Sequence, residues 1–180
     1  MDLSGLSLEL IRVLFFAALP VAVISFGFVF LAIKRGYIDA EEPVESLSKK
    51  RKQAKKEKTE FKVNPIHSKW LYFGGGYYGL MALSTYAHVE ILEVYNFFAN
   101  YTSLAELLEQ ISLGAVIRLI INSFMNLVPA FTWFLYWPDI IDIQRGWYWL
   151  GGSYAGYYVG DIIARQIIIR KAYIDSENKQ

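Results

Sequence analysis

Hydrophobic residues in this chain are gathered into long windows, and most charged residues lie between them. The first window, 13–33, has 21 residues without a charged side chain and ends abruptly at Lys34 and Arg35. A helix of about 20 residues crosses the hydrocarbon core of a bilayer. The pattern therefore predicts a transmembrane helix here, with a kink at Pro20.

Three later windows have a similar character. The second begins with the aromatic residues Trp70 and Tyr72 and runs to Val89, and the third, 119–138, holds 20 residues without a charge. The fourth begins at Trp147 and is interrupted by Asp161 and Arg165. We therefore expect an all-α integral membrane protein with about four transmembrane helices. Their expected bounds are 10–33, 69–92, 114–137 and 147–169.

The segment 34–69 is the one clearly hydrophilic stretch, and it divides the chain into three regions. It carries 11 Lys and Arg residues against six Asp and Glu residues, so we interpret it as a charged loop, with a short solvated helix as one form. Region 1–33 is then the first membrane helix, and region 70–180 holds the other three. The excess of basic residues places the loop in the cytoplasm.

Four crossings put both termini outside the cell. This topology leaves Arg165, Arg170, Lys171 and Lys179 at the outer side, against the positive-inside tendency. A fourth segment that enters the membrane without crossing it leaves the tail inside instead. Both topologies are kept as expectations.

A short amphipathic helix is expected between the second and third windows. Residues 103–113 have apolar positions at helical spacing, and Ser103 with Glu106 resembles a capping box. Such a helix lies flat in the membrane interface.

Two glycine-rich segments resemble each other at an offset of 77 residues. Residues 70–79 (WLYFGGGYYG) and 147–156 (WYWLGGSYAG) share five positions, namely one Trp, one Tyr and three Gly. We interpret this as an internal repeat in parallel orientation, with chance similarity between two aromatic segments as the alternative.

Glycine residues four apart share one face of a helix and let a neighbouring backbone approach closely. Close helix packing is the preferred interpretation, and a groove for a lipid, quinone or substrate is the alternative. The predicted helix-packing residues are Gly75, Gly79, Gly152, Gly156 and Gly160.

Ionisable residues inside a membrane are costly and so are candidate functional groups. The candidates here are His88, Arg118, Asp161 and Arg165. Asp161 and Arg165 are four residues apart, so an ion pair within one helix is the preferred interpretation of these two residues.

The basic run in the loop has three possible roles. It can set topology as a solvated segment, hold anionic lipid headgroups, or bind an acidic partner protein. Nucleic-acid binding is not expected, because no aromatic residues interleave with the basic ones. The candidate contact residues are Lys49, Lys50, Arg51, Lys52, Lys55 and Lys56.

Composition removes several kinds of chemistry. The chain of 180 residues has no Cys and only two His, and its net charge is +1. HExxH, phosphate-loop and GxSxG motifs are absent from the sequence. We expect no cofactor, no metal site and no enzymatic activity.

Two functional hypotheses follow. In the first, the protein is a non-catalytic subunit, scaffold or assembly factor of a larger complex in a bacterial-type inner membrane, in contact with lipids and with other subunits or itself. In the second, it is a small oligomeric transporter or channel in which Arg118, Asp161 and Arg165 line a polar path.

Overall fold

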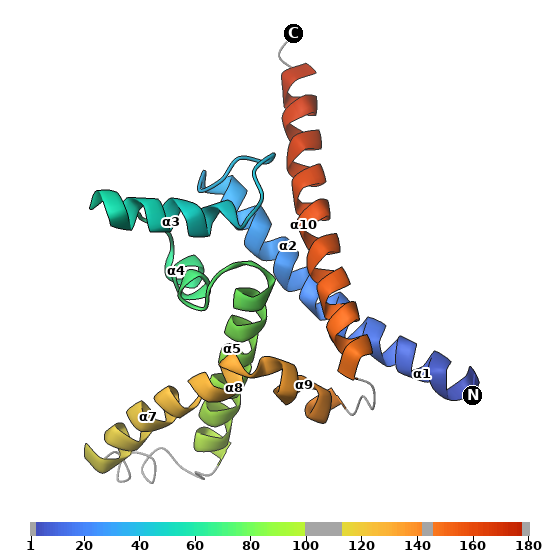
Figure 1. The fold of residues 1–180 in the computed structure, drawn as a ribbon, viewed down its shortest axis with the longest axis vertical. Helices are drawn as coiled ribbons and strands as arrows, with labels where there is room; N and C mark the ends of the chain where they lie inside the picture. Colours follow the sequence, from blue (N-terminus) through green and yellow to red (C-terminus); the bar gives the residue numbers. More distant parts are fainter. Residues whose placement is uncertain (1–2, 100–112, 142–145, 178–180) are drawn as a thin grey trace.

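The computed structural model describes residues 3–99, 113–141 and 146–177, and all regular structure within these ranges is helical (Figure 1). The predicted amphipathic helix at 103–113 falls almost wholly outside them.

The chain begins with one continuous helical rod, which we call the N-terminal helix. It consists of α1 (Leu3–Val13), a π-helical turn η1 (Leu14–Ala18) and α2 (Leu19–Lys34). Pro20 has no backbone N–H to donate to the preceding turn, and the wider π turn directly before it adapts the helix to that loss. The chain therefore continues helically through the predicted kink site.

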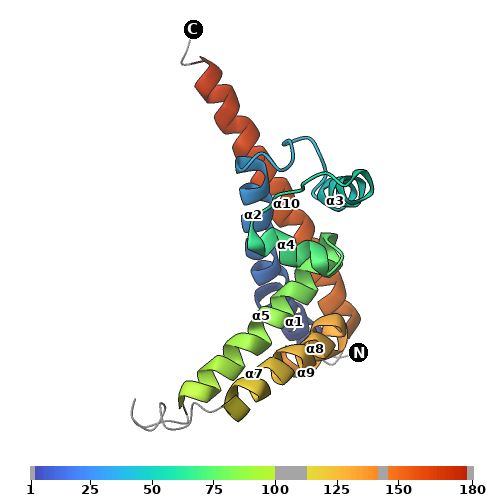
Figure 2. The same ribbon diagram turned by 90° about the vertical axis from the view of Figure 1, so that its left-hand side faces the viewer.

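The helix α10 (Gly146–Glu177), with 32 residues, packs against the N-terminal helix and runs in the same general direction. Gly152 lies against Val13, Gly156 against Ala18, and Gly160 against Ala22 and Phe26. Residue numbers therefore rise together on both helices. The C-terminal end of α10 marks the top of the molecule in both views, and the N-terminus lies well below it (Figures 1 and 2).

The predicted second span is not one helix. α4 (Pro65–Tyr72) ends before a turn at Gly74, Gly75 and Gly76, which all have positive φ angles of 102°, 72° and 59°. Only glycine adopts these angles without steric cost, and the turn redirects the chain into α5 (Gly76–Ala99). The expectation of a continuous helix over 69–92 is wrong for this reason.

The predicted third span is also broken. It consists of α7 (Leu113–Met125), α8 (Leu127–Phe131) and α9 (Trp133–Ile141). The tip of this segment, at Phe131 and Trp133, packs beside Tyr78 near the start of α5. Toward both ends the segment lies beside later parts of α5: Asn126 contacts Glu93, and Trp137 contacts Thr85. The chain thus runs beside α5 through α8 toward the start of α5, turns, and returns through α9. The segment forms a helical hairpin.

The basic run forms α3 (Ser46–Glu57), which projects to one side of the long helices (Figure 2). Ile38 and Val44 before this helix, and Leu47 in its first turn, are buried. Segment 37–47 therefore packs onto the helices, whereas sequence analysis described the whole of 34–69 as solvated.

One helix among the described residues, Leu6–Lys34, is long and apolar enough to cross a membrane by its 29-residue length and its composition. Core helices of soluble proteins and signal sequences meet the same criterion. One such helix is weak evidence for membrane association, and the four-span arrangement stays a prediction.

Candidate functional site

The glycine face of α10 is used inside the molecule. A Cβ atom built on Gly156 would overlap the carbonyl oxygen of Ala18, and one on Gly160 would overlap that of Ala22. Ser25 strengthens the contact, because its hydroxyl donates to the Tyr157 carbonyl at 2.8 Å. The N-terminal helix therefore packs directly against Gly156 and Gly160, and these two glycines also line one edge of the second groove described below.

The earlier glycine pair has a different role from the predicted one. Gly75 lies in the turn before α5, where a Cβ atom would overlap the Ser48 hydroxyl of α3. Gly79 lies in α5, with the backbone carbonyl of Trp70 2.9 Å from a built Cβ atom. The two residues therefore do not form one helical face; they bring α3 and α4 close to the start of α5.

The two copies of the proposed repeat have different backbones but touch each other. Residues 70–79 form a helix end and a turn, whereas 147–156 lie within α10. The equivalent residues Tyr77 and Tyr154 pack edge to face, with ring centroids 5.2 Å apart. Tyr77 also shares a hydrogen bond of 2.6 Å with the hydroxyl of Ser153.

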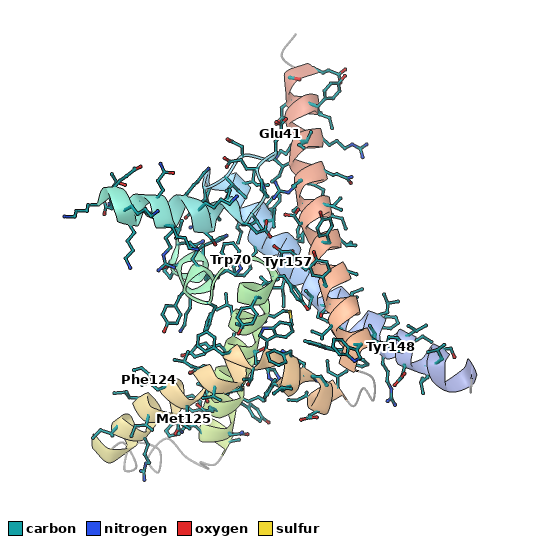
Figure 3. All side chains as sticks on the ribbon, viewed as in Figure 1. Glu41, Trp70, Phe124, Met125, Tyr148 and Tyr157 are labelled. Atoms are coloured by element: carbon teal, nitrogen blue, oxygen red, sulfur yellow. The ribbon has the colours of Figure 1, made fainter. Side chains whose placement is uncertain are left out.

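Arg165 connects α10 to the loop that precedes α3. Its Nε donates to Asp161 Oδ2 at 2.9 Å, and its Nη1 donates to the carbonyl oxygens of Ala40 and Glu42. About two turns before Arg165, the Tyr157 hydroxyl donates to Glu45 Oε1 at 2.6 Å. Tyr157 is labelled in Figure 3. We call this set of contacts the loop clamp.

The remaining predicted polar residues lie elsewhere. His88 on α5 shares a hydrogen bond of 3.1 Å with the Tyr136 hydroxyl, and its ring packs 4.9 Å from Trp137. Arg118 is exposed on α7. None of Arg118, Asp161 and Arg165 lines either of the two large cavities described below.

Two sets of polar contacts were not predicted from the sequence. Asn126 is buried between α5 and α8, where its amide donates to Glu93 at 2.8 Å and to Glu90 at 3.4 Å. His67 is almost fully buried in α4, although the sequence assigned it to the flank of a solvated loop. Side chains from distant parts of the sequence bury His67, so the residues next to it in the sequence do not predict its burial.

Two apolar grooves lie on either side of the N-terminal helix. The first, of about 730 Å³, lies between this helix, α4 and α5, and its few polar lining residues include Lys69 and His88. The second, of about 630 Å³, lies between the N-terminal helix and α10. Phe15, on the outer side of the helix, is 57% exposed. Phe16 in the first groove and Val23 in the second are each 63% exposed.

The basic residues of α3 are not equivalent. Lys50 is bound to Glu42 Oε2 at 2.6 Å, and this contact lowers the pKa of the Glu42 carboxyl. Arg51 and Lys55 line a hollow against the segment that follows α3. The other predicted contact residues on this helix are Lys49, Lys52 and Lys56.

No group of three or more His, Asp or Glu side chains that could hold a metal ion occurs in the described ranges. Comparisons with family models, curated proteins and solved structures find no match.

Proposed function

We propose that the protein is a multi-pass membrane protein with three crossings and one hairpin that enters the membrane and returns. The N-terminal helix, α5 and α10 are the crossing helices, and α7 to α9 form the hairpin. At 1.5 Å per residue these three helices measure about 36–48 Å, which exceeds a hydrocarbon core of about 30 Å.

The parallel packing of α10 and the N-terminal helix supports this arrangement. Two parallel crossing helices need an odd number of crossings between them, and α5 supplies one. The loop with α3 and the end of α10 then lie on one side of the membrane. Arg170 and Lys171 join the basic loop there, which satisfies the positive-inside tendency that four crossings violate. We assign this side to the cytoplasm of a bacterial-type inner membrane.

Within this membrane the protein acts by association, as a subunit, scaffold or assembly factor and not as a catalyst. The observation that carries the proposal is the pair of apolar grooves on either side of the N-terminal helix, together with the exposed phenylalanines of that helix. Concave apolar surfaces of this size suit the side chains of another membrane helix, which gains van der Waals contact that lipid tails give less completely.

A transporter is less well supported. Its polar path would need Asp161 and Arg165 to be open to water, but the loop clamp occupies both side chains. Arg118 is on a different helix, outside the clamp.

Gentle solubilisation from the native membrane, followed by native mass measurement, tests the association. We expect a stable complex with partner chains or with further copies of this chain. Replacement of Ala87 in the first groove, or Ala155 in the second, by Trp should reduce recovery of that complex, because the indole fills the groove.

Ile121→Trp is the matched control, since Ile121 is 54% exposed on α7 and lines neither groove. A wild-type protein recovered only as a lone monomer would contradict the proposal. If Asp161→Asn also abolished transport of a defined solute in liposomes, the transporter would replace it.

A further inference from the structure

A small hollow separates α3 from the segment 59–71. Its volume is about 270 Å³, and its polar lining consists of the cations Arg51 and Lys55 with the hydroxyl residues Thr59 and Ser68. Three apolar side chains, Phe61, Val63 and Leu71, complete the wall. No acidic residue is among the residues that line it.

The two cations are available to a ligand. Arg51 and Lys55 are four residues apart and so lie on one face of α3. Neither forms an ion pair or a side-chain hydrogen bond with any residue that the structure describes, whereas Lys50 on the same helix is bound to Glu42. The Thr59 hydroxyl donates to the Ala54 carbonyl of α3 at 3.4 Å. An arginine fork, a lysine ammonium group and the Ser68 hydroxyl on one concave surface match the oxygen atoms of a phosphate group.

The position of the hollow indicates where that phosphate comes from. His67 of α4 contacts the Phe28 carbonyl, which lies six residues before Lys34, so α4 is about 9 Å below the end of the N-terminal helix. Ile66 and Tyr72 of α4 are 56% and 60% exposed. An exposed apolar surface beside a cationic hollow is suited to the boundary between acyl chains and headgroups.

We propose that this hollow binds the phosphate of an anionic membrane phospholipid. The proposal rests on the membrane placement given above, but not on the association with partner chains. In this proposal Arg51 and Lys55 bind the phosphate directly. The other basic residues of α3 attract the anionic membrane surface only through their charge.

The test is binding of a fluorescent phosphatidylglycerol to the purified full-length chain in mixed micelles with phosphatidylcholine. The site variant is Arg51→Gln with Lys55→Gln. The control is Lys52→Gln with Lys56→Gln, which removes two charges at the same spacing from a neighbouring face of α3. Because both variants lose the same general charge, we expect the site variant to bind the lipid about tenfold more weakly than the control.

Equal losses in the two variants would overturn the proposal in favour of diffuse electrostatic attraction. Inorganic phosphate that displaces the lipid at about millimolar concentration would assign the hollow to a soluble ligand. An acidic peptide that displaces the lipid more effectively than phosphate would assign it to a protein partner.

The circular dichroism spectrum and the thermal midpoint of each variant check that it is folded before its lipid binding is compared. Recovery of partner chains is measured separately. If partner chains are recovered but the two variants bind the lipid equally well, only the lipid-binding inference is contradicted. If the two variants differ in lipid affinity but no partner chain is recovered, only the proposed association is contradicted.

Discussion

At Gly156 the backbone of α10 lies directly against the backbone of the N-terminal helix. The carbonyl carbon and Cα of Ala18 are 2.8 and 2.9 Å from the position that a Cβ atom would take. Backbone atoms cannot rotate away as the end of a flexible side chain can. Even the smallest side chain at residue 156 must therefore separate the two helices.

We predict that Gly156→Ala destabilises the protein by about 1–3 kcal/mol, the usual range for overpacking. Gly151→Ala is the control, because a Cβ atom at Gly151 meets nothing within 4 Å. Alanine has the higher helix propensity, so the control should be neutral or stabilising by up to about 1 kcal/mol. Thermal midpoints in a mild detergent measure both, and equal midpoints for the two variants would refute the packing argument.

His67 is held in α4 by polar contacts on both sides of its ring. Nδ1 is 2.9 Å from Asn64 Oδ1, and Nε2 is 3.1 Å from the Phe28 carbonyl oxygen. Burial lowers the pKa of His67 below 6.5; the Phe28 carbonyl opposes this shift and Arg35 adds to it. In the proposed topology α4 lies at the membrane surface, outside the crossing helices.

This lowered pKa gives stability a pH dependence. As the pH falls through about 6.5, the unfolded chain binds a proton at His67 before the folded chain does, so the free energy of unfolding decreases. We predict that the thermal midpoint of the wild type decreases as the pH is lowered from about 7.5 to 5.5. The midpoint of His67→Gln should decrease less over the same pH range. If the thermal midpoint of His67→Gln depends on pH as steeply as that of the wild type, His67 does not contribute to the pH dependence of stability.

Local sequence features predicted part of these residue-scale contacts. The spacing of Gly152, Gly156 and Gly160 by four marks one helix face, and the structure brings that face against another helix. The same spacing misled at Gly75 and Gly79, because spacing carries no information on φ. His67 escaped attention because its environment is built by Phe28 and Tyr37, both from distant parts of the chain.

At the level of elements, the difference from the sequence prediction is where helices end. Windows of uncharged residues predicted continuous helices over 69–92 and 114–137, since hydropathy does not register a turn made of apolar or neutral residues. Three consecutive glycines divide the first. In the second, the hydroxyl of Thr132 donates to the Val128 carbonyl at 2.8 Å, and this stabilises the end of α8 at the hairpin tip.

The loop clamp is the element-scale contact with the clearest consequence. Arg165 donates to two loop carbonyls and to Asp161, and its side chain is only 15% exposed. Hydrogen bonds that involve a charged group contribute about 1.5–3 kcal/mol each, so their loss should release the loop from α10.

We predict that Arg165→Gln increases hydrogen exchange and protease cleavage in segment 39–45. Arg170→Gln is the control, because Arg170 is exposed on the same helix and has no bonded partner in the described residues. If both variants exchange at the wild-type rate in this segment, the clamp does not hold the loop.

For the whole molecule, the sequence predicted an all-helical chain, and the regular structure of the described residues is helical; the membrane topology stays a proposal. In the proposed topology the number of crossings depends on the direction of α10. That direction follows from contacts such as Val13 with Gly152, which no hydropathy window reveals. The basic residues near the C-terminus were the one sequence feature that argued against four crossings. Their charge agrees with the parallel arrangement, in which the end of α10 and α3 lie on the same side.

The topology can be tested with single cysteines, since the natural chain has none. With three crossings and a returning hairpin, Ser48→Cys in α3 and Ser176→Cys in α10 both face the cytoplasm, and Asn96→Cys near the end of α5 faces outward. We predict that an impermeant maleimide labels only Asn96→Cys in intact cells and labels all three after permeabilisation. Labelling of Ser176→Cys in intact cells, with Ser48→Cys protected, would instead require an even number of crossings and return the protein to the four-span topology. The Asn96→Cys result is the internal control, because this residue lies on the outer side in both topologies.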